Sequence, residues 1–204
     1  MSIRKSLCML PNRIVPDVRE KRKNWGKLTS EYDINNLVFL DESGVNTNMT
    51  RLYARALGGG RAVDSTPLNT PQGTTILSSI RINGQTVYTT YPGGTTAEKF
   101  AEYLKDILIP TLDKDSVIVM DNMRSHHAKD VKKVLEQSGI KYLYLPPYSP
   151  DLNPIEKLWS KMKAFLRKEK VRIANELPAA IQKAFSTISD SDCEGWFHAS
   201  GYMH

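Results

Sequence analysis

Two continuous apolar runs, each followed at once by an aspartate, constrain the fold of this chain more than any other feature. Residues 37–40 (Leu-Val-Phe-Leu) precede Asp41, and residues 117–120 (Val-Ile-Val-Met) precede Asp121. Apolar runs without alternation are typical of strands that are covered on both faces. Ligand sites in open sheets of this kind lie beyond the carboxyl ends of the strands. We expect each strand to end at its aspartate, and if the two strands are neighbours, we expect Asp41 and Asp121 to share one crevice.

The remaining pattern predicts a mixed α/β domain with helices on the faces of the sheet. Strands at 75–82 and 85–91 flank Asn83-Gly84, a dipeptide that favours a tight hairpin because both residues tolerate positive φ. Spacing and breakers predict the other elements. These are a leader helix around 18–25, helices at 96–109 and 128–137, a strand at 142–145, a long helix from 153–154, and one or two short helices after 176.

The length of 204 residues suits one domain with a substantial core. We predict a basic helical leader at 1–34, a central α/β domain at 35–172 and a helical tail at 173–204 that packs on it. The net charge of +6 is uneven, since residues 1–28 and residues 157–172 each carry +6 and the remainder totals −6. Basic segments around an acidic middle suit an enzyme that binds a polyanion. Solvated helix faces are the structural alternative.

Asp41 and Asp121 would repel each other in a shared crevice, and a bound cation would relieve that repulsion. A few hard oxygen ligands, with room left for a substrate phosphate, favour Mg²⁺ or Mn²⁺ over zinc. A strand-end turn or a helix cap is the structural alternative for either aspartate. The adjacent His126 and His127 lack the nitrogen and sulfur partners that a zinc site needs.

Glu156 has two readings at the start of the long helix. Residues 153–156 (Asn-Pro-Ile-Glu) resemble a capping box, with proline at the first helical position. The same placement presents a carboxylate at the rim of the sheet, on one helix face with Ser160, Lys163 and Arg167. That face could bind a metal ion and follow phosphates. The local sequence leaves both readings open.

Three acidic motifs resemble those of mariner-like DDE transposases, and more narrowly the bacterial insertion-sequence branch of that superfamily. The first is 38–44 (Val-Phe-Leu-Asp-Glu-Ser-Gly), and the second is 119–122 (Val-Met-Asp-Asn) followed by Ser125-His126. The third is 145–156 (Leu-Pro-Pro-Tyr-Ser-Pro-Asp-Leu-Asn-Pro-Ile-Glu). Between Asp121 and Glu156 lie 34 residues, a spacing characteristic of this superfamily.

The resemblance implies a ribonuclease H-like fold and metal-dependent cleavage and strand transfer at the inverted-repeat ends of an insertion sequence. Asp41, Asp121 and Glu156 would hold two Mg²⁺ or Mn²⁺ ions when DNA is bound, with Asp41 bridging them. A ribonuclease H-like nuclease or resolvase, and an inactive domesticated copy that only binds DNA, are the alternatives.

The implied partners are double-stranded DNA, as transposon ends and as target, and a second copy of the chain. Relatives carry helix-turn-helix modules ahead of the catalytic domain, so a separate DNA-binding polypeptide is a further expected partner. No apolar run approaches the roughly 20 residues that span a bilayer, and residues 1–15 make a poor signal peptide. We expect a cytoplasmic, nucleoid-associated protein.

Several further residues are candidates for supporting roles. Asn122 and His126 are expected to support the second acid, and Glu42 is expected to point to the opposite side of its strand from Asp41. Trp159 falls on the apolar stripe of the long helix and is assigned to the core. The candidate DNA contacts are Arg61, Tyr148, Lys157, Lys161, Lys163 and Arg167.

Overall fold

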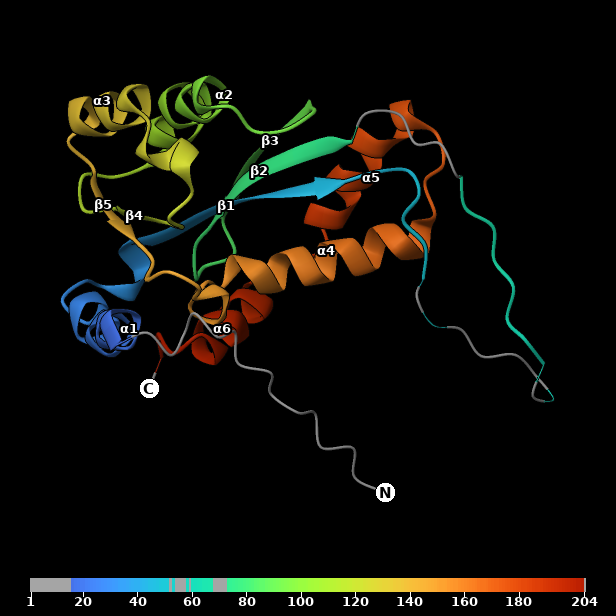
Figure 1. The fold of residues 1–204 in the computed structure, drawn as a ribbon, viewed down its shortest axis with the longest axis horizontal. Coiled ribbons are helices and arrows are strands. Elements are labelled where there is room, and N and C mark those ends of the chain that lie inside the picture. The colour runs from blue at the N-terminus through green and yellow to red at the C-terminus, as the bar shows by residue number, and fades with distance from the viewer. Residues whose placement is uncertain (1–15, 52, 54–57, 59, 68–72, 204) are drawn as a thin grey trace.

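The computed structural model describes residues 16–51, 53, 58, 60–67 and 73–203. Its centre is a five-stranded sheet with the order β3-β2-β1-β4-β5 (Figure 1). The strands are β1 (Leu37–Val45), β2 (Thr74–Ile80), β3 (Thr86–Pro92), β4 (Val117–Met120) and β5 (Lys141–Tyr144). β1 pairs with β2 antiparallel and with β4 parallel, and β4 pairs with β5 parallel. The sheet is therefore mixed, as predicted.

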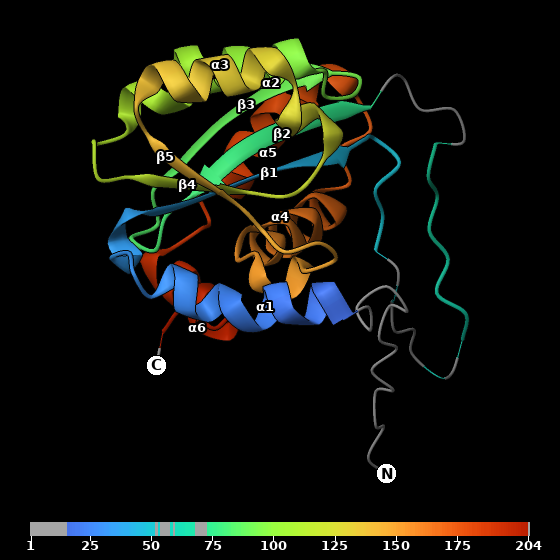
Figure 2. The ribbon, with the colours of Figure 1, turned by 60° about the vertical axis from the view of Figure 1, so that its left-hand side comes forward.

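Helices cover both faces of the sheet (Figures 1 and 2). One face carries α2, a π-helical turn and α3, and the other carries α1, α4, α5 and α6. The α-helices are α1 (Pro16–Thr29), α2 (Ala97–Glu102), α3 (Lys129–Ser138), α4 (Ile155–Glu169), α5 (Leu177–Phe185) and α6 (Asp190–Ala199). The π-helical turn is Tyr103–Leu108, and short 3-10 turns are Ile34–Asn36, Ile109–Thr111, Arg124–His127, Pro150–Leu152 and Ala174–Glu176.

Two apolar clusters hold these layers together because β1 and β4 bury both of their faces. Phe39 and Val119 point into the larger cluster with α4, α5 and α6, whereas Leu40 and Met120 point into the smaller one with α2 and α3. The larger cluster also includes Trp25 from α1. Unbroken apolar runs are explained by this arrangement, in which neither side of the strand faces water.

The expected elements are present, with one difference in kind. The segment predicted as a helix at 96–109 is α-helical only to Glu102 and then π-helical to Leu108, where the N–H of Ile109 bonds the carbonyl of Leu104. Apolar residues spaced three and four apart fit either hydrogen-bond pattern, so the sequence could not separate them. The tail predicted as one or two helices forms α5 and α6.

The ends of the tail and leader meet on the α4 side of the sheet. Trp25 Nε1 donates to the Tyr202 hydroxyl over 2.7 Å, and that hydroxyl donates to the Leu152 carbonyl, also over 2.7 Å. Phe185 of α5 stacks on Tyr88 of β3, with ring centroids 3.8 Å apart. The bond to the Leu152 carbonyl ties the segment before α4 to the C-terminal tail, and the ring contact ties α5 to β3. Within the described ranges, no helix has both the length and the apolar character needed to cross a bilayer.

Candidate active site

The first two acids lie where the parallel ladder between β1 and β4 ends. The last paired residues are Leu40 and Met120, so Asp41 and Asp121 are the next residues on adjacent strands. The expectation that the first strand ends at Asp41 is wrong, because β1 continues to Val45. β2 supplies antiparallel partners for this extension, and those partners could not be read from the apolar run alone.

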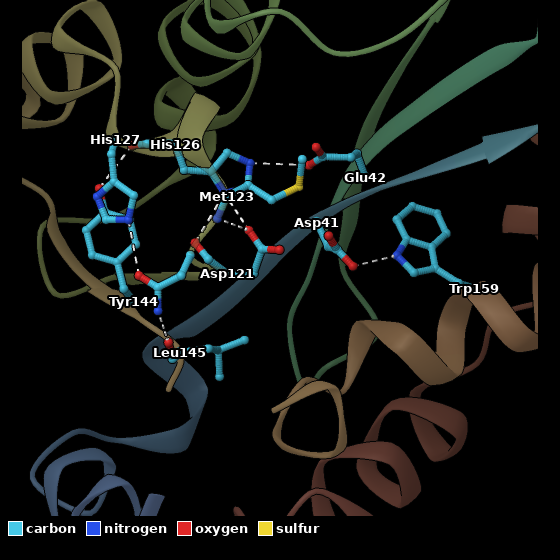
Figure 3. A network of polar contacts seen from close by, with 10 residues as sticks. Asp41, Glu42, Asp121, Met123, His126, His127, Tyr144, Leu145 and Trp159 are labelled. Atoms are coloured by element: carbon cyan, nitrogen blue, oxygen red, sulfur yellow. Dashed lines mark hydrogen bonds and ion pairs between the residues drawn. The ribbon is translucent and has the colours of Figure 1, made fainter. Parts of the chain in front are cut away.

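Asp41 is nearly buried, with 8% of its surface exposed, and its Oδ2 accepts a hydrogen bond of 3.1 Å from Trp159 Nε1 (Figure 3). Burial raises the pKa of Asp41 to about 7, although a hydrogen bond from the Glu42 backbone acts to lower it. Three neighbouring carboxylates add to this shift in pKa, those of Glu42, Asp121 and Glu156. The raised pKa of Asp41 therefore has two causes, first the burial of the carboxyl and second the negative charge of its acidic neighbours.

Asp121 is held by groups that follow it in the chain. His126 Nδ1 lies 2.8 Å from its Oδ1, and the Met123 N–H donates to the same oxygen over 3.0 Å. Burial alone would raise the pKa of Asp121, but these contacts outweigh burial and lower it. Asp121 is thus kept ionised beside Asp41, whose pKa moves the opposite way.

His126 links β1 to the end of β4, because its ring contacts both Glu42 and Asp121. It is fully buried, stacks on Phe100 at 4.1 Å between ring centroids, and places Nε2 3.3 Å from Glu42 Oε2. Burial alone would lower the pKa of His126, but Asp121 and Glu42 raise it to about 9. Glu42 does point away from the Asp41 side of β1, as predicted, and there it contacts the histidine that holds Asp121 (Figure 3).

Asn122 braces the neighbouring strand ends. Its amide donates to the Leu145 carbonyl, and its Oδ1 lies 3.1 Å from His127 Nε2. His127 in turn stacks on Tyr144 of β5, with ring centroids 4.1 Å apart. Asn122 therefore fixes the backbone beside Asp121.

Glu156 lies in the first turn of α4 with an exposed side chain. Partial burial raises its pKa; Lys163 opposes this and Asp121 adds to it. The capping-box alternative is not realised, because α4 has no side-chain cap hydrogen bond and the buried Oδ1 of Asn153 has no partner. The Glu156 carboxylate therefore makes no cap, and its charge affects the pKa of Asp41 while the charge of Asp121 affects its own.

The donor set of this site fits a hard divalent cation. It consists of carboxylate oxygens; burial is the main cause of the raised pKa of Asp41, and the neighbouring carboxylates add to it. Across the described part of the chain, no three His, Cys, Asp or Glu side chains already converge as a set that could hold an ion.

The basic candidates on α4 divide into two groups. Lys163 and Arg167 line a groove of about 310 Å³ with residues 44–46 and 48–50, at the far end of β1. Lys157 instead donates to Ser200 Oγ over 2.8 Å, and Lys161 contacts the Thr187 carbonyl and Asp192. Both lysines are partly exposed and contact the C-terminal segment, and their predicted contact with DNA stays a prediction.

The other two candidates lie on loops. Arg61 is exposed in the connection between β1 and β2, and Figure 1 draws residues 60–67 away from the sheet. Tyr148 is 50% exposed in the loop before α4 and has a positive φ of 56°, which is unusual for a residue other than glycine.

The hydrogen bond from Trp159 to Asp41 was missed by the sequence interpretation, which placed Trp159 in the core. That placement is correct, with 3% of the residue exposed. The available signal was its position three residues after Glu156, about one helical turn further along, which brings the buried indole close to the acids.

Comparisons with known proteins agree with this geometry. A family profile described as "DDE superfamily endonuclease" matches residues 36–177. A Mos1 transposase paired-end complex with left transposon end is similar at 22% identity and a TM-score of 0.76, over 97% of this chain and 63% of that chain. The catalytic domain of Mos1 mariner transposase is similar at 18% identity and a TM-score of 0.69, over 93% of this chain and 89% of that chain. These likenesses show a ribonuclease H-like fold.

A curated relative matches over a shorter stretch. Transposable element Tcb2 transposase of Caenorhabditis briggsae is 31% identical over 78 residues, which are 38% of this chain and 29% of that protein. The chain thus spans about three tenths of the curated relative and less than two thirds of the Mos1 chain in the paired-end complex.

Proposed function

Because the chain belongs to the DDE superfamily endonucleases, we propose that it is the catalytic domain of a mariner-like DNA transposase that cleaves and joins DNA. The observation that carries this proposal is the placement of two acids side by side on neighbouring strands, with the third coupled to them electrostatically. Asp41 and Asp121 follow the last residues of one parallel ladder, and Glu156 couples electrostatically to both. Metal-dependent phosphodiester chemistry uses clustered carboxylates of this kind to hold divalent cations.

Asp41, Asp121 and Glu156 are the proposed ligands of two Mg²⁺ or Mn²⁺ ions. Such ions would activate an attacking water or DNA 3′-hydroxyl and stabilise the leaving oxygen. Because the pKa of Asp41 is raised to about 7, an ion that binds this carboxylate would compete with a proton near neutral pH. Two Mos1 catalytic-domain structures are described as containing Mg or Mn, which supports this choice of ions.

Asn122 and His126 are proposed to position the second acid. The protonated His126 ring holds Asp121 from one side, and Glu42 fixes the ring from the other. Asn122 ties the end of β4 to the Leu145 carbonyl. Together these contacts restrict the carboxylate of Asp121 before any ion binds.

Lys163 and Arg167 are proposed to bind DNA phosphates. They line the groove beyond Asp41 on the same helix as Glu156, so a strand lying there would reach the acids. Phosphate contacts of this kind position a duplex without reading its sequence. Tyr148 is proposed to stack on a base near the site, and Arg61 to contact DNA from its loop.

We further propose that the substrate is the inverted-repeat end of a bacterial insertion sequence, acted on in the nucleoid by a homodimer. A separate helix-turn-helix polypeptide is the proposed partner for specific recognition of that end. The domains are proposed to divide at 1–34, 35–172 and 173–204.

The test is incubation of the full chain with Mn²⁺ or Mg²⁺ and duplex DNA carrying the inverted repeats that flank its gene. Asp41→Asn and Glu156→Gln should each abolish nicking at the repeat boundary and joining to a target. Glu136→Gln is the matched control, since it removes an exposed carboxylate from α3.

The result of this cleavage assay distinguishes the proposed transposase from the two alternative functions. Metal-dependent nicking without joining would favour a ribonuclease H-like nuclease or resolvase. Binding of DNA without cleavage, even when the helix-turn-helix polypeptide is added in trans, would identify an inactive copy. Cleavage that survives both substitutions would refute the assignment of the acids.

A further inference from the structure

Trp159 has a polar group that its core position does not explain. The indole is 3% exposed within the larger apolar cluster, where its N–H needs a partner. That partner is Oδ2 of Asp41, at 3.1 Å. Figure 3 shows the ring reaching from α4 toward β1, with Asp41 between Trp159 and Asp121.

We propose that Trp159 is a positioning residue for the first acid, holding one carboxylate oxygen of Asp41 so that the other oxygen is presented to a divalent cation. This inference rests on the proposed function. A carboxylate can rotate about its last side-chain bond, and a fixed donor on one oxygen sets the plane of both. Donors that orient ligands in this way typically change metal affinity by roughly 10–100-fold when removed.

The donor is itself rigid, which a positioning role requires. Trp159 is packed among apolar residues of α4 and the sheet, so its ring has little freedom. It also lies one helical turn after Glu156. The docking of α4 against β1 therefore sets the third acid and the orientation of the first acid together.

The two aspartates are held in parallel ways from opposite sides. His126, fully buried, contacts Asp121, and Trp159 contacts Asp41. In each case a ring nitrogen fixed by packing addresses one oxygen of one carboxylate (Figure 3).

The test measures Mn²⁺ affinity of the full chain from the electron paramagnetic resonance signal of the free ion. Trp159→Phe keeps an aromatic ring and removes the N–H, and we expect it to weaken binding by roughly tenfold or more. Trp25→Phe is the matched control, because it removes another buried indole N–H, the donor to Tyr202. It should leave the affinity unchanged, whereas Asp41→Asn should abolish binding at this site.

A second measurement needs no substitution at the site. The chain has three tryptophans, so ¹⁵N-labelled protein gives three indole N–H signals. Addition of Mg²⁺ should shift the Trp159 signal and leave those of Trp25 and Trp196 in place. This readout decides the question if Trp159→Phe does not fold.

The outcomes separate the two levels of inference. If wild type shows no Mn²⁺ binding that depends on Asp41, the proposed metal site fails. If wild type binds, but Trp159→Phe binds equally well or the Trp159 signal does not respond, the positioning role is overturned and the metal site stands.

Discussion

Replacing Asp41 by asparagine should make the metal-free protein more stable while it removes the proposed activity. The pKa of Asp41 rises from its ordinary value of 3.8 to about 7 on folding. A folded-state pKa above the unfolded one means that an acid opposes folding once the pH exceeds the unfolded value, and that the cost grows until the folded value is passed. Three pKa units at roughly 1.4 kcal/mol each give about 4 kcal/mol above about pH 7.

Asparagine avoids this cost because it carries no charge, and its oxygen can still accept from Trp159. At about pH 5 the folded carboxyl is protonated and the unfolded one ionised, so the cost is only about 1.5 kcal/mol. Because Asp41 is coupled to neighbouring carboxylates, we expect a gain in unfolding free energy of about 2–4 kcal/mol near pH 8. The gain should be clearly smaller near pH 5.

Urea unfolding in EDTA at the two pH values measures this difference. Added Mg²⁺ should reduce the stability difference between Asp41→Asn and the wild type near pH 8, because an ion bound to the folded state stabilises the wild type. A gain that does not change with pH, or a loss of stability near pH 8, would refute the account of a buried, uncompensated carboxylate at position 41.

Three other predictions test the groove, the junction of the chain ends and the hairpin. Lys163→Ala should weaken DNA binding about equally for all sequences and reduce the salt-dependence slope by about one, as measured by fluorescence anisotropy at several salt concentrations; an unchanged slope would exclude a phosphate contact. Tyr202→Phe removes the partner of the Trp25 N–H and should cost about 2–3 kcal/mol in urea unfolding; in a Trp25→Phe background the cost should shrink, and additive costs would argue against the bond. Gly84→Ala meets a positive φ of 81° and a close approach to the Asp190 side chain, so it should cost about 1–3 kcal/mol; Asp190→Ala should recover part of that loss, and no recovery would mean that backbone strain alone is responsible.

The placement of Asp41 and Asp121 could be predicted because it depends on local sequence. An unbroken apolar run indicates a strand buried on both faces, and in both β1 and β4 the aspartate follows the last residue of the parallel ladder. The continuation of β1 to Val45 could not be predicted, because it depends on pairing with β2, a strand that begins at Thr74.

The surroundings of α4 show the same limit. Its apolar stripe predicted the buried face, and Trp159 is indeed in the core. The sequence could not show that Lys157 and Lys161 lie against residues 187–200, since those contacts join segments far apart in the chain. It also could not show that Asn153 leaves the helix uncapped, because a capping box in sequence requires a matching backbone geometry.

The larger apolar cluster has a consequence for synthesis on the ribosome. It joins Trp25 near one end of the described chain to Ala184 and Phe197 near the other. The face of the sheet that carries Trp159 and α4 is therefore incomplete while residues after about 177 are still inside the exit tunnel. Domains commonly fold as units during translation. The nascent chain would hold Asp41 and Asp121 on a half-covered sheet, and this face would become fully packed only after residues 177–197 have left the tunnel.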